Sequence, residues 1–135
     1  MGMDVFGREP SAECGEYFRA NIWGWGPLHS LMEETCSDLL GEELITAMSY
    51  NEGQGPDGQD VCTAMADRLE RAVGDQEREF VAESSLRVDA KGRLLSDEEI
   101  AGMAPGDTFS PYRIDAEFVR KWIQFLRHCG GFSVF

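Results

Sequence analysis

The fold is decided by the stretch from Asp115 to Cys129, which reads Asp-Ala-Glu-Phe-Val-Arg-Lys-Trp-Ile-Gln-Phe-Leu-Arg-His-Cys. Its apolar residues recur at intervals of three or four, which is the period of an α-helix with one buried face. They are Phe118, Val119, Trp122, Phe125, Leu126 and Cys129. Gly130 and Gly131 follow, and glycine commonly ends a helix. We predict that this helix, the most apolar of the chain, lies at the centre of the core.

Two short segments at opposite ends of the chain have the composition of strands. Residues 3–6 read Met-Asp-Val-Phe and residues 132–135 read Phe-Ser-Val-Phe, and both valine and phenylalanine favour a pleated surface. Each strand alone would leave an open edge, so pairing the two satisfies both backbones. We therefore expect a minimal sheet that pairs the N-terminal strand with the C-terminal strand.

The pattern between residues 11 and 49 is helical. A short helical turn is expected over residues 11–21, and the Trp-Gly-Trp-Gly-Pro run at 23–27 is expected to break it. Proline suits the first position of a helix, so Pro27 is predicted to begin a new one with an apolar stripe. A further helix is expected over residues 42–49.

Residues 51–58, Asn-Glu-Gly-Gln-Gly-Pro-Asp-Gly, predict a loop before a well-marked helix, which Asp57 or Asp60 is expected to cap. A glycine-rich loop before a helix can bind phosphate. This one lacks the lysine and hydroxyl residue of a P-loop, and its acids would repel an anion, so a connector is favoured over a nucleotide site. A polar helical stretch is predicted over residues 75–84.

The next segment predicts a hairpin over residues 86–95 with its turn at 89–92. Ser96 followed by Glu99 fits a capping box for one short helical turn. Since the chain has no internal repeat and an ordinary domain length, we predict a single domain over residues 1–135. Its class is α+β, mainly helical, with five to six helices and a minimal sheet.

The composition is strongly acidic. Among 135 residues, 25 are acidic and 12 are basic, which gives a formal net charge of -13. Such a surface repels phosphate, so direct nucleic-acid binding is not expected, and a macromolecular partner is expected to be basic. No apolar run approaches the ~20 residues of a membrane span, which predicts a cytoplasmic chain without a membrane partner. The four cysteines form no CxxC pair, so reduced thiols are expected.

Several segments together resemble a family of small uncharacterised proteins of bacteria and their phages. The resemblance is carried by Met-Gly-Met-Asp-Val-Phe-Gly at residues 1–7, Gly-Glu-Tyr-Phe-Arg at 15–19, Trp23 and Trp25 with Pro27-Leu28, Asn-Glu-Gly-Gln-Gly at 51–55, and Phe-Leu-Arg-His-Cys-Gly-Gly-Phe at 125–132. In longer members the region before the closing helix resembles a zinc-ribbon insertion with paired CxxC motifs, whereas residues 86–111 here hold no cysteine. The resemblance implies a shared core and a phage or prophage setting, and it implies no enzyme activity.

His29, Glu33 and Cys36 stand at i, i+4 and i+7 of one predicted helix, a spacing that can direct three ligands toward one metal ion. Cys36 also belongs to the apolar stripe, so this is a weak metal candidate and no cofactor is expected. His128 precedes Cys129, and a neighbouring imidazolium could activate the Cys129 thiol. Cys129 lies on the core stripe, however, and a helix C-terminus disfavours thiolate, so no catalytic residue is predicted.

Trp23 and Trp25 belong to the densest aromatic cluster of the chain. Tryptophans flanked by glycines can serve as interface anchors or, equally, as the lid of the core. Burial is the favoured alternative, and both residues are kept as candidate partner contacts. Self-association through this region would make the protein a homo-oligomeric component of an assembly.

The acidic stretch over residues 33–79 is the least ordinary feature. A solvated face is its simplest account, since acidic surfaces promote solubility. Carboxylates on rigid helices can also imitate a nucleic-acid backbone and occupy a basic groove. The hypothesis is a non-enzymatic phage-type inhibitor that binds a basic surface of a host nucleic-acid-handling protein, and a small metal-binding or structural assembly protein is the alternative. The candidate contacts are Glu33, Glu34, Asp38, Glu42, Glu43, Asp67 and Glu70.

Overall fold

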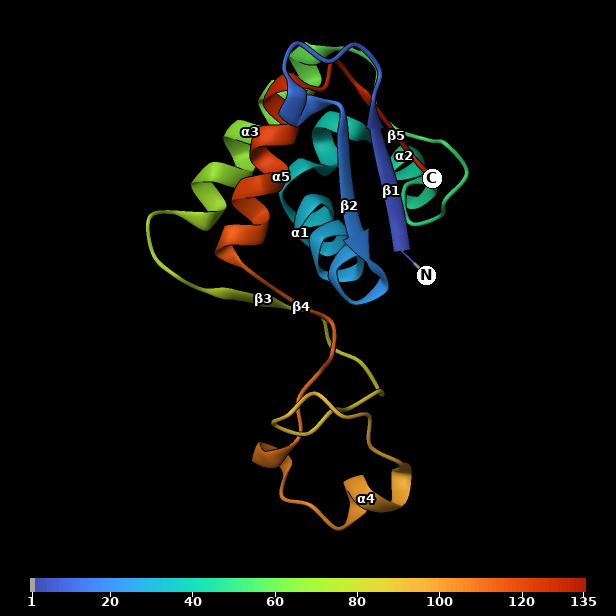
Figure 1. The fold of residues 1–135 in the computed structure, drawn as a ribbon, viewed down its shortest axis with the longest axis vertical. Helices are drawn as coiled ribbons and strands as arrows, with labels where there is room; N and C mark the ends of the chain where they lie inside the picture. Colours follow the sequence, from blue (N-terminus) through green and yellow to red (C-terminus); the bar gives the residue numbers. More distant parts are fainter. Residues whose placement is uncertain (1) are drawn as a thin grey trace.

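A computed structural model describes residues 2–135 (Figure 1). The predicted closing helix is α5 (Ala116–His128), and Asp115 caps it, because its carboxylate accepts a hydrogen bond of 2.8 Å from the Phe118 amide. α5 packs along α3 (Gln59–Val73), which in turn packs against α1 (Ile22–Leu40). The largest buried side chains of α5 are Trp122, Phe125 and Leu126. The central position predicted for this helix is confirmed.

The predicted pairing of the terminal strands is present in a three-stranded antiparallel sheet. β1 (Gly2–Gly7) lies between β2 (Tyr17–Asn21) and β5 (Phe132–Val134). Val5 of β1 pairs with Phe18 on one side and with Val134 on the other. Figure 1 shows β1 and β2 beside α1, which both strands contact. The fold is α+β and mainly helical, as predicted.

Residues 11–21 do not form the predicted helical turn. They hold a short 3-10 turn, η1 (Glu13–Gly15), followed by β2. The prediction was wrong because Tyr-Phe-Arg-Ala-Asn alternates as a strand does: Phe18 and Ala20 are the less exposed residues, whereas Tyr17 and Arg19 face solvent. Pairing with β1 satisfies a backbone that a short isolated helix would leave in water.

α1 begins at Ile22, ahead of the predicted start at Pro27. The side-chain oxygen of Asn21 accepts a hydrogen bond of 2.8 Å from the Gly24 amide and so caps the helix. The break predicted over residues 23–27 was therefore wrong, because this cap and the burial of Trp25 hold the first turn in helical form despite its glycines. Pro27 is tolerated near the start of the helix. α2 (Glu42–Ala47) then falls within the predicted range.

The glycine-rich loop, residues 51–58, runs beside β5 and covers its outer edge. The Gly53 amide donates a hydrogen bond of 2.7 Å to the Val134 carbonyl. Gly55 approaches the strand so closely that a Cβ atom there would lie 2.0 Å from the Phe132 carbonyl oxygen. Gly55 is thus explained by the close approach of two backbones.

α3 begins without a side-chain cap, so neither Asp57 nor Asp60 has the expected capping role. Asp57 instead forms an ion pair with Arg8. The Arg8 guanidinium also donates a hydrogen bond of 3.3 Å to the Gly55 carbonyl. Arg8 therefore ties the end of β1 to the glycine-rich loop.

The segment after α3 is extended. β3 (Glu79–Val81) pairs antiparallel with β4 (Arg113–Asp115), and Phe80 lies opposite Ile114. The helix predicted over residues 75–84 was wrong, because this polar segment has no apolar stripe to bury, whereas the strand pair covers Ile114. Among residues 2–135, no helix is long and apolar enough to cross a membrane.

Residues 82–112 project from the rest of the chain and are called the arm, and residues 2–81 with 113–135 are called the body (Figure 1). The arm holds α4 (Asp97–Ala101) and a 3-10 turn, η2 (Pro105–Asp107). The two ends of the arm are joined by a hydrogen bond of 2.9 Å, which the Ala82 amide donates to the Tyr112 carbonyl.

Two local predictions are confirmed in the arm. The turn at residues 89–92 is closed by a hydrogen bond of 2.9 Å from the Gly92 amide to the Asp89 carbonyl. The capping box of Ser96 and Glu99 is present at the start of α4. Both features depend on a few neighbouring residues, which is why the sequence sufficed to predict them.

Candidate partner-binding surface

Four of the candidate carboxylates are exposed on α1 and α2, two helices that contact each other. Glu33 and Glu34 lie on α1, and Glu42 and Glu43 occupy the first turn of α2. Glu33 and Glu42 line the same shallow hollow. None of the four forms an ion pair within residues 2–135. We call Glu33, Glu34, Glu42 and Glu43 the acidic corner.

Asp38 has a partner inside the molecule. Its carboxylate accepts two hydrogen bonds, of 2.5 and 2.8 Å, from the Arg68 guanidinium, which also donates to the Thr35 carbonyl at 3.1 Å. The Arg68 guanidinium holds the pKa of Asp38 below its usual value. Asp38 therefore links α1 to α3, and its charge is compensated.

Asp67 and Glu70 also have an internal partner. Both carboxylates lie 3.0 Å from the guanidinium of Arg127, a residue of α5. The Arg127 side chain is only 27% exposed, so it is held between the two helices that it joins. These two acids connect α3 to α5 and are less available to a partner than the acidic corner.

Trp25 is part of the core. It is 4% exposed, its indole N–H donates a hydrogen bond of 3.0 Å to the Met48 carbonyl, and its ring stands at a right angle to that of Trp122. The burial favoured for this ring is confirmed, and little of it is left for a partner to contact. Trp23 is partly exposed and packs on Tyr112 of the arm, with ring centroids 5.1 Å apart.

The weak metal candidate does not assemble. His29 donates a hydrogen bond from Nε2 to the Ile45 carbonyl at 2.6 Å. Cys36 is fully buried, and its burial raises the pKa of the thiol, whereas Glu33 faces solvent. Within residues 2–135, no three His, Cys, Asp or Glu side chains are placed to hold a metal ion.

The Cys129 thiol, weighed as a nucleophile, is fully buried. It lies against the buried thiol of Cys62, and this contact together with burial raises the pKa of Cys62 above its usual value. The neighbouring His128 has its Nδ1 atom 3.1 Å from the Ser11 hydroxyl. The hydrogen bond with Cys62 lowers the pKa of Cys129, but burial opposes this shift. Both thiols are fully buried, so neither is accessible to a substrate and the pair has the character of core residues.

An apolar hollow of about 410 Å³ opens beside Trp25. His29, Tyr50 and Tyr112 are among its lining residues. Its volume falls in the range of small-ligand pockets, which run from roughly 300 to 1,000 Å³. The lining residues come from β1, α1, the loop after α2 and the arm, so no local sequence pattern could have marked them.

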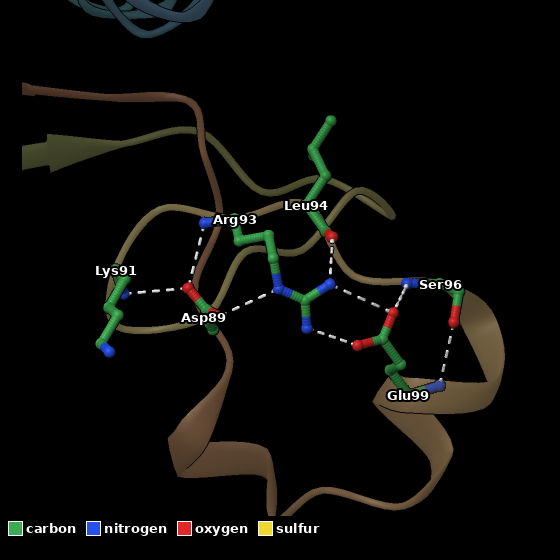
Figure 2. Close-up of polar contacts among 6 residues, drawn as sticks. All are labelled: Asp89, Lys91, Arg93, Leu94, Ser96 and Glu99. Carbon is green, nitrogen blue, oxygen red and sulfur yellow. Dashed lines mark hydrogen bonds and ion pairs between the residues drawn. The ribbon is translucent and has the colours of Figure 1, made fainter.

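Arg93 organises the arm (Figure 2). Its guanidinium lies 2.5 Å from the Glu99 carboxylate and 3.5 Å from that of Asp89. The Asp89 carboxylate also accepts hydrogen bonds of 2.9 and 3.0 Å from the amides of Lys91 and Arg93, and that of Glu99 accepts one of 3.2 Å from the Ser96 amide. The pKa of Glu99 is lowered to about 2, mainly by the Arg93 guanidinium and next by the Ser96 amide. The Arg93 amide is the main cause of the lowered pKa of Asp89.

The outer face of the sheet carries a row of aromatic rings that the sequence analysis missed. Phe6 of β1 lies between Tyr17 of β2 and Phe135, which follows β5, with ring centroids 5.3 and 5.9 Å apart. The three side chains are 46%, 47% and 51% exposed, respectively. Strand alternation was the available signal, because a buried Val5 requires its neighbour Phe6 to face outward. We call Phe6, Tyr17 and Phe135 the aromatic row.

No protein-family model, curated protein or solved structure matches this chain. The family resemblance carried by the sequence motifs therefore stays a prediction. The features that bear on function are the acidic corner, the aromatic row and the apolar hollow.

Proposed function

We propose that this protein is a non-enzymatic interaction protein whose acidic corner binds a basic surface of another protein. The observation that carries the proposal is that Glu33, Glu34, Glu42 and Glu43 are exposed on adjoining helices and form no ion pair with any of residues 2–135. An unpaired carboxylate keeps its full attraction for a cation on a partner, whereas a paired one must first lose its own.

The position of the four acids on helices supports this role. Helical backbones keep carboxylates at fixed spacings, and a net charge of -13 steers a basic partner toward the molecule. A groove that binds nucleic acid is the best-known basic surface with a regular array of cations. The proposed partner is therefore a nucleic-acid-handling protein, which the acidic corner inhibits by occupying that groove. The sequence resemblance adds a phage or prophage setting to this proposal.

Affinity capture from bacterial lysate tests the proposal, with the wild-type chain and a variant that carries Glu33→Lys, Glu34→Lys, Glu42→Lys and Glu43→Lys as baits. We expect the wild type to retain a basic nucleic-acid-binding protein near 0.1 M salt and to release it as salt approaches roughly 0.5 M, because the Debye length shrinks. The variant should retain that protein at least ten-fold less.

A matched control reverses the same number of charges elsewhere. Glu13, Asp75, Glu98 and Asp107 are exposed and form no ion pair within residues 2–135. A Glu13→Lys, Asp75→Lys, Glu98→Lys and Asp107→Lys variant should capture nearly as well as the wild type. Equal loss in both variants would mean that overall charge, not the acidic corner, attracts the partner.

A further inference from the structure

We propose that the outer face of the sheet binds a second copy of this chain, with the aromatic row at the centre of a two-fold contact. Three large rings, each about half exposed, lie in a row there with Phe6 in the middle. The other large exposed apolar side chains of residues 2–135 are spread over α1, the loop after α2, β3 and the arm. Contiguous exposed apolar surface of this kind marks interaction sites more often than scattered single residues do.

The charges on this face determine the kind of occupant. Arg19 lies 2.7 Å from Asp4, and Arg8 pairs with Asp57, so the exposed arginines of the face are already neutralised. A nucleic acid or an anionic lipid surface would find both of these arginines already paired, and would be repelled by the net charge of -13. A basic partner would find no unpaired carboxylate among these pairs.

A second copy fits the same charges. Two chains of net charge -13 repel each other, so they can meet only where the local charge is cancelled, and the outer face of the sheet meets that condition. The Asp4–Arg19 pair also presents an anion and a cation side by side, which is self-complementary under a two-fold axis. The Tyr17 hydroxyl donates to Asp4 and so holds this pair next to the aromatic row.

The contact geometry follows from the sheet. Two sheets stack at about 10 Å with their side chains interdigitated, which is the separation at which aromatic rows can pack. Burying the exposed half of each ring removes apolar surface from water on both copies. This inference is independent of the proposed function, because the aromatic row and the acidic corner share no residue.

Sedimentation equilibrium of the purified chain from about 1 µM to about 1 mM tests the proposal, since weak protein contacts populate within this range. We expect a reversible shift toward twice the mass of one chain. Raising salt should strengthen this dimer, because salt screens the repulsion between two acidic chains. Raised salt should instead weaken binding of the basic partner to the acidic corner. The two salt responses therefore distinguish failure of this proposal from failure of the proposed function.

Variants locate the contact. Phe6→Ser and Phe135→Ser should each weaken dimerisation by roughly ten-fold or more, whereas Leu86→Ser, at a 44% exposed position of the arm, should not. Phe135 follows the last strand, so its variant retains the sheet even if Phe6→Ser disturbs it. A monomer at every concentration, or a dimer that persists in Phe135→Ser, would overturn the proposal. The proposal would also be overturned if the chain stayed monomeric and bound a single-stranded oligonucleotide or neutral phosphatidylcholine vesicles through Phe135.

Discussion

In the body, aromatic rings enclosed by three helices and a sheet exclude water, whereas in the arm a few ion pairs and capped turns hold the chain in place. Trp122, which is fully buried, contacts the rings of Trp25, Phe125 and Phe132. The buried residues of the arm are Val88, Thr108 and Ser110, two of which are polar. A segment too small to bury a core can thus keep a defined shape by satisfying its polar groups, and its order then depends on charge.

The largest expected effect tests the apolar half of this comparison. Trp122→Ala should lower the free energy of unfolding of the body by about 3–5 kcal/mol, because it removes the largest ring of the core. Urea denaturation followed by circular dichroism measures the loss. Within residues 2–135 the Trp122 indole N–H has no hydrogen-bond partner, so Trp122→Phe should cost roughly half as much or less. Similar losses for both variants would contradict a purely apolar role for this ring.

The next effect tests the charged half. The folded pKa of Glu99, about 2, lies below its usual 4.5, so its pairing stabilises the arm above about pH 4.5 and is lost as the pH falls toward 2. Asp89, whose pKa is also lowered, acts in the same direction. NMR spectra recorded from pH 6 down to roughly pH 2 should show the arm resonances collapsing first.

A matched variant separates the network from general acid effects. Glu99→Gln removes the titrating group, so the arm should already be loosened at pH 6 and should change less on acidification. Its body resonances should match those of the wild type. An arm that stays ordered at pH 2 in the wild type would show that the network of Figure 2 does not hold it.

The smallest effect sharpens the comparison within the arm. Gly92 has a φ of +85°, and no atom lies within 4 Å of the position that a Cβ would take there, so Gly92→Ala adds backbone strain without a clash. It should raise the local opening of the arm by about 1 kcal/mol, measured by hydrogen exchange, with no change in the unfolding of the body. Gly106→Ala, at an equally open position without a positive φ, is the control and should be close to neutral.

The sequence predicted best those features that neighbouring residues determine. The stripe of α5 and the capping box at Ser96 both lie within one helix, and both are present. β2 was missed because its alternation is short and its partner, β1, had been paired only with the other end of the chain. The early start of α1 was missed because proline and glycine suggested a break that the Asn21 cap overcomes.

The candidate surface was predicted only in part. The acidity of residues 33–79 could be seen directly, but which acids are free depends on arginines far away in sequence. Arg68 neutralises Asp38, and Arg127 neutralises Asp67 together with Glu70. No periodicity connects these positions, since the fold alone brings them together. The same holds for the aromatic row, whose members come from β1, from β2 and from the residue after β5.

The attachment of the arm makes this fold tolerant of change in chain length. Ala82 and Tyr112 are hydrogen-bonded neighbours at the end of the β3–β4 pair, so the chain leaves the body and returns to it at one place. Closing a loop costs only about 0.6 kcal/mol more for each doubling of its length. The arm could therefore be replaced by a reporter domain, a metal-binding module or a short turn without preventing the core from folding.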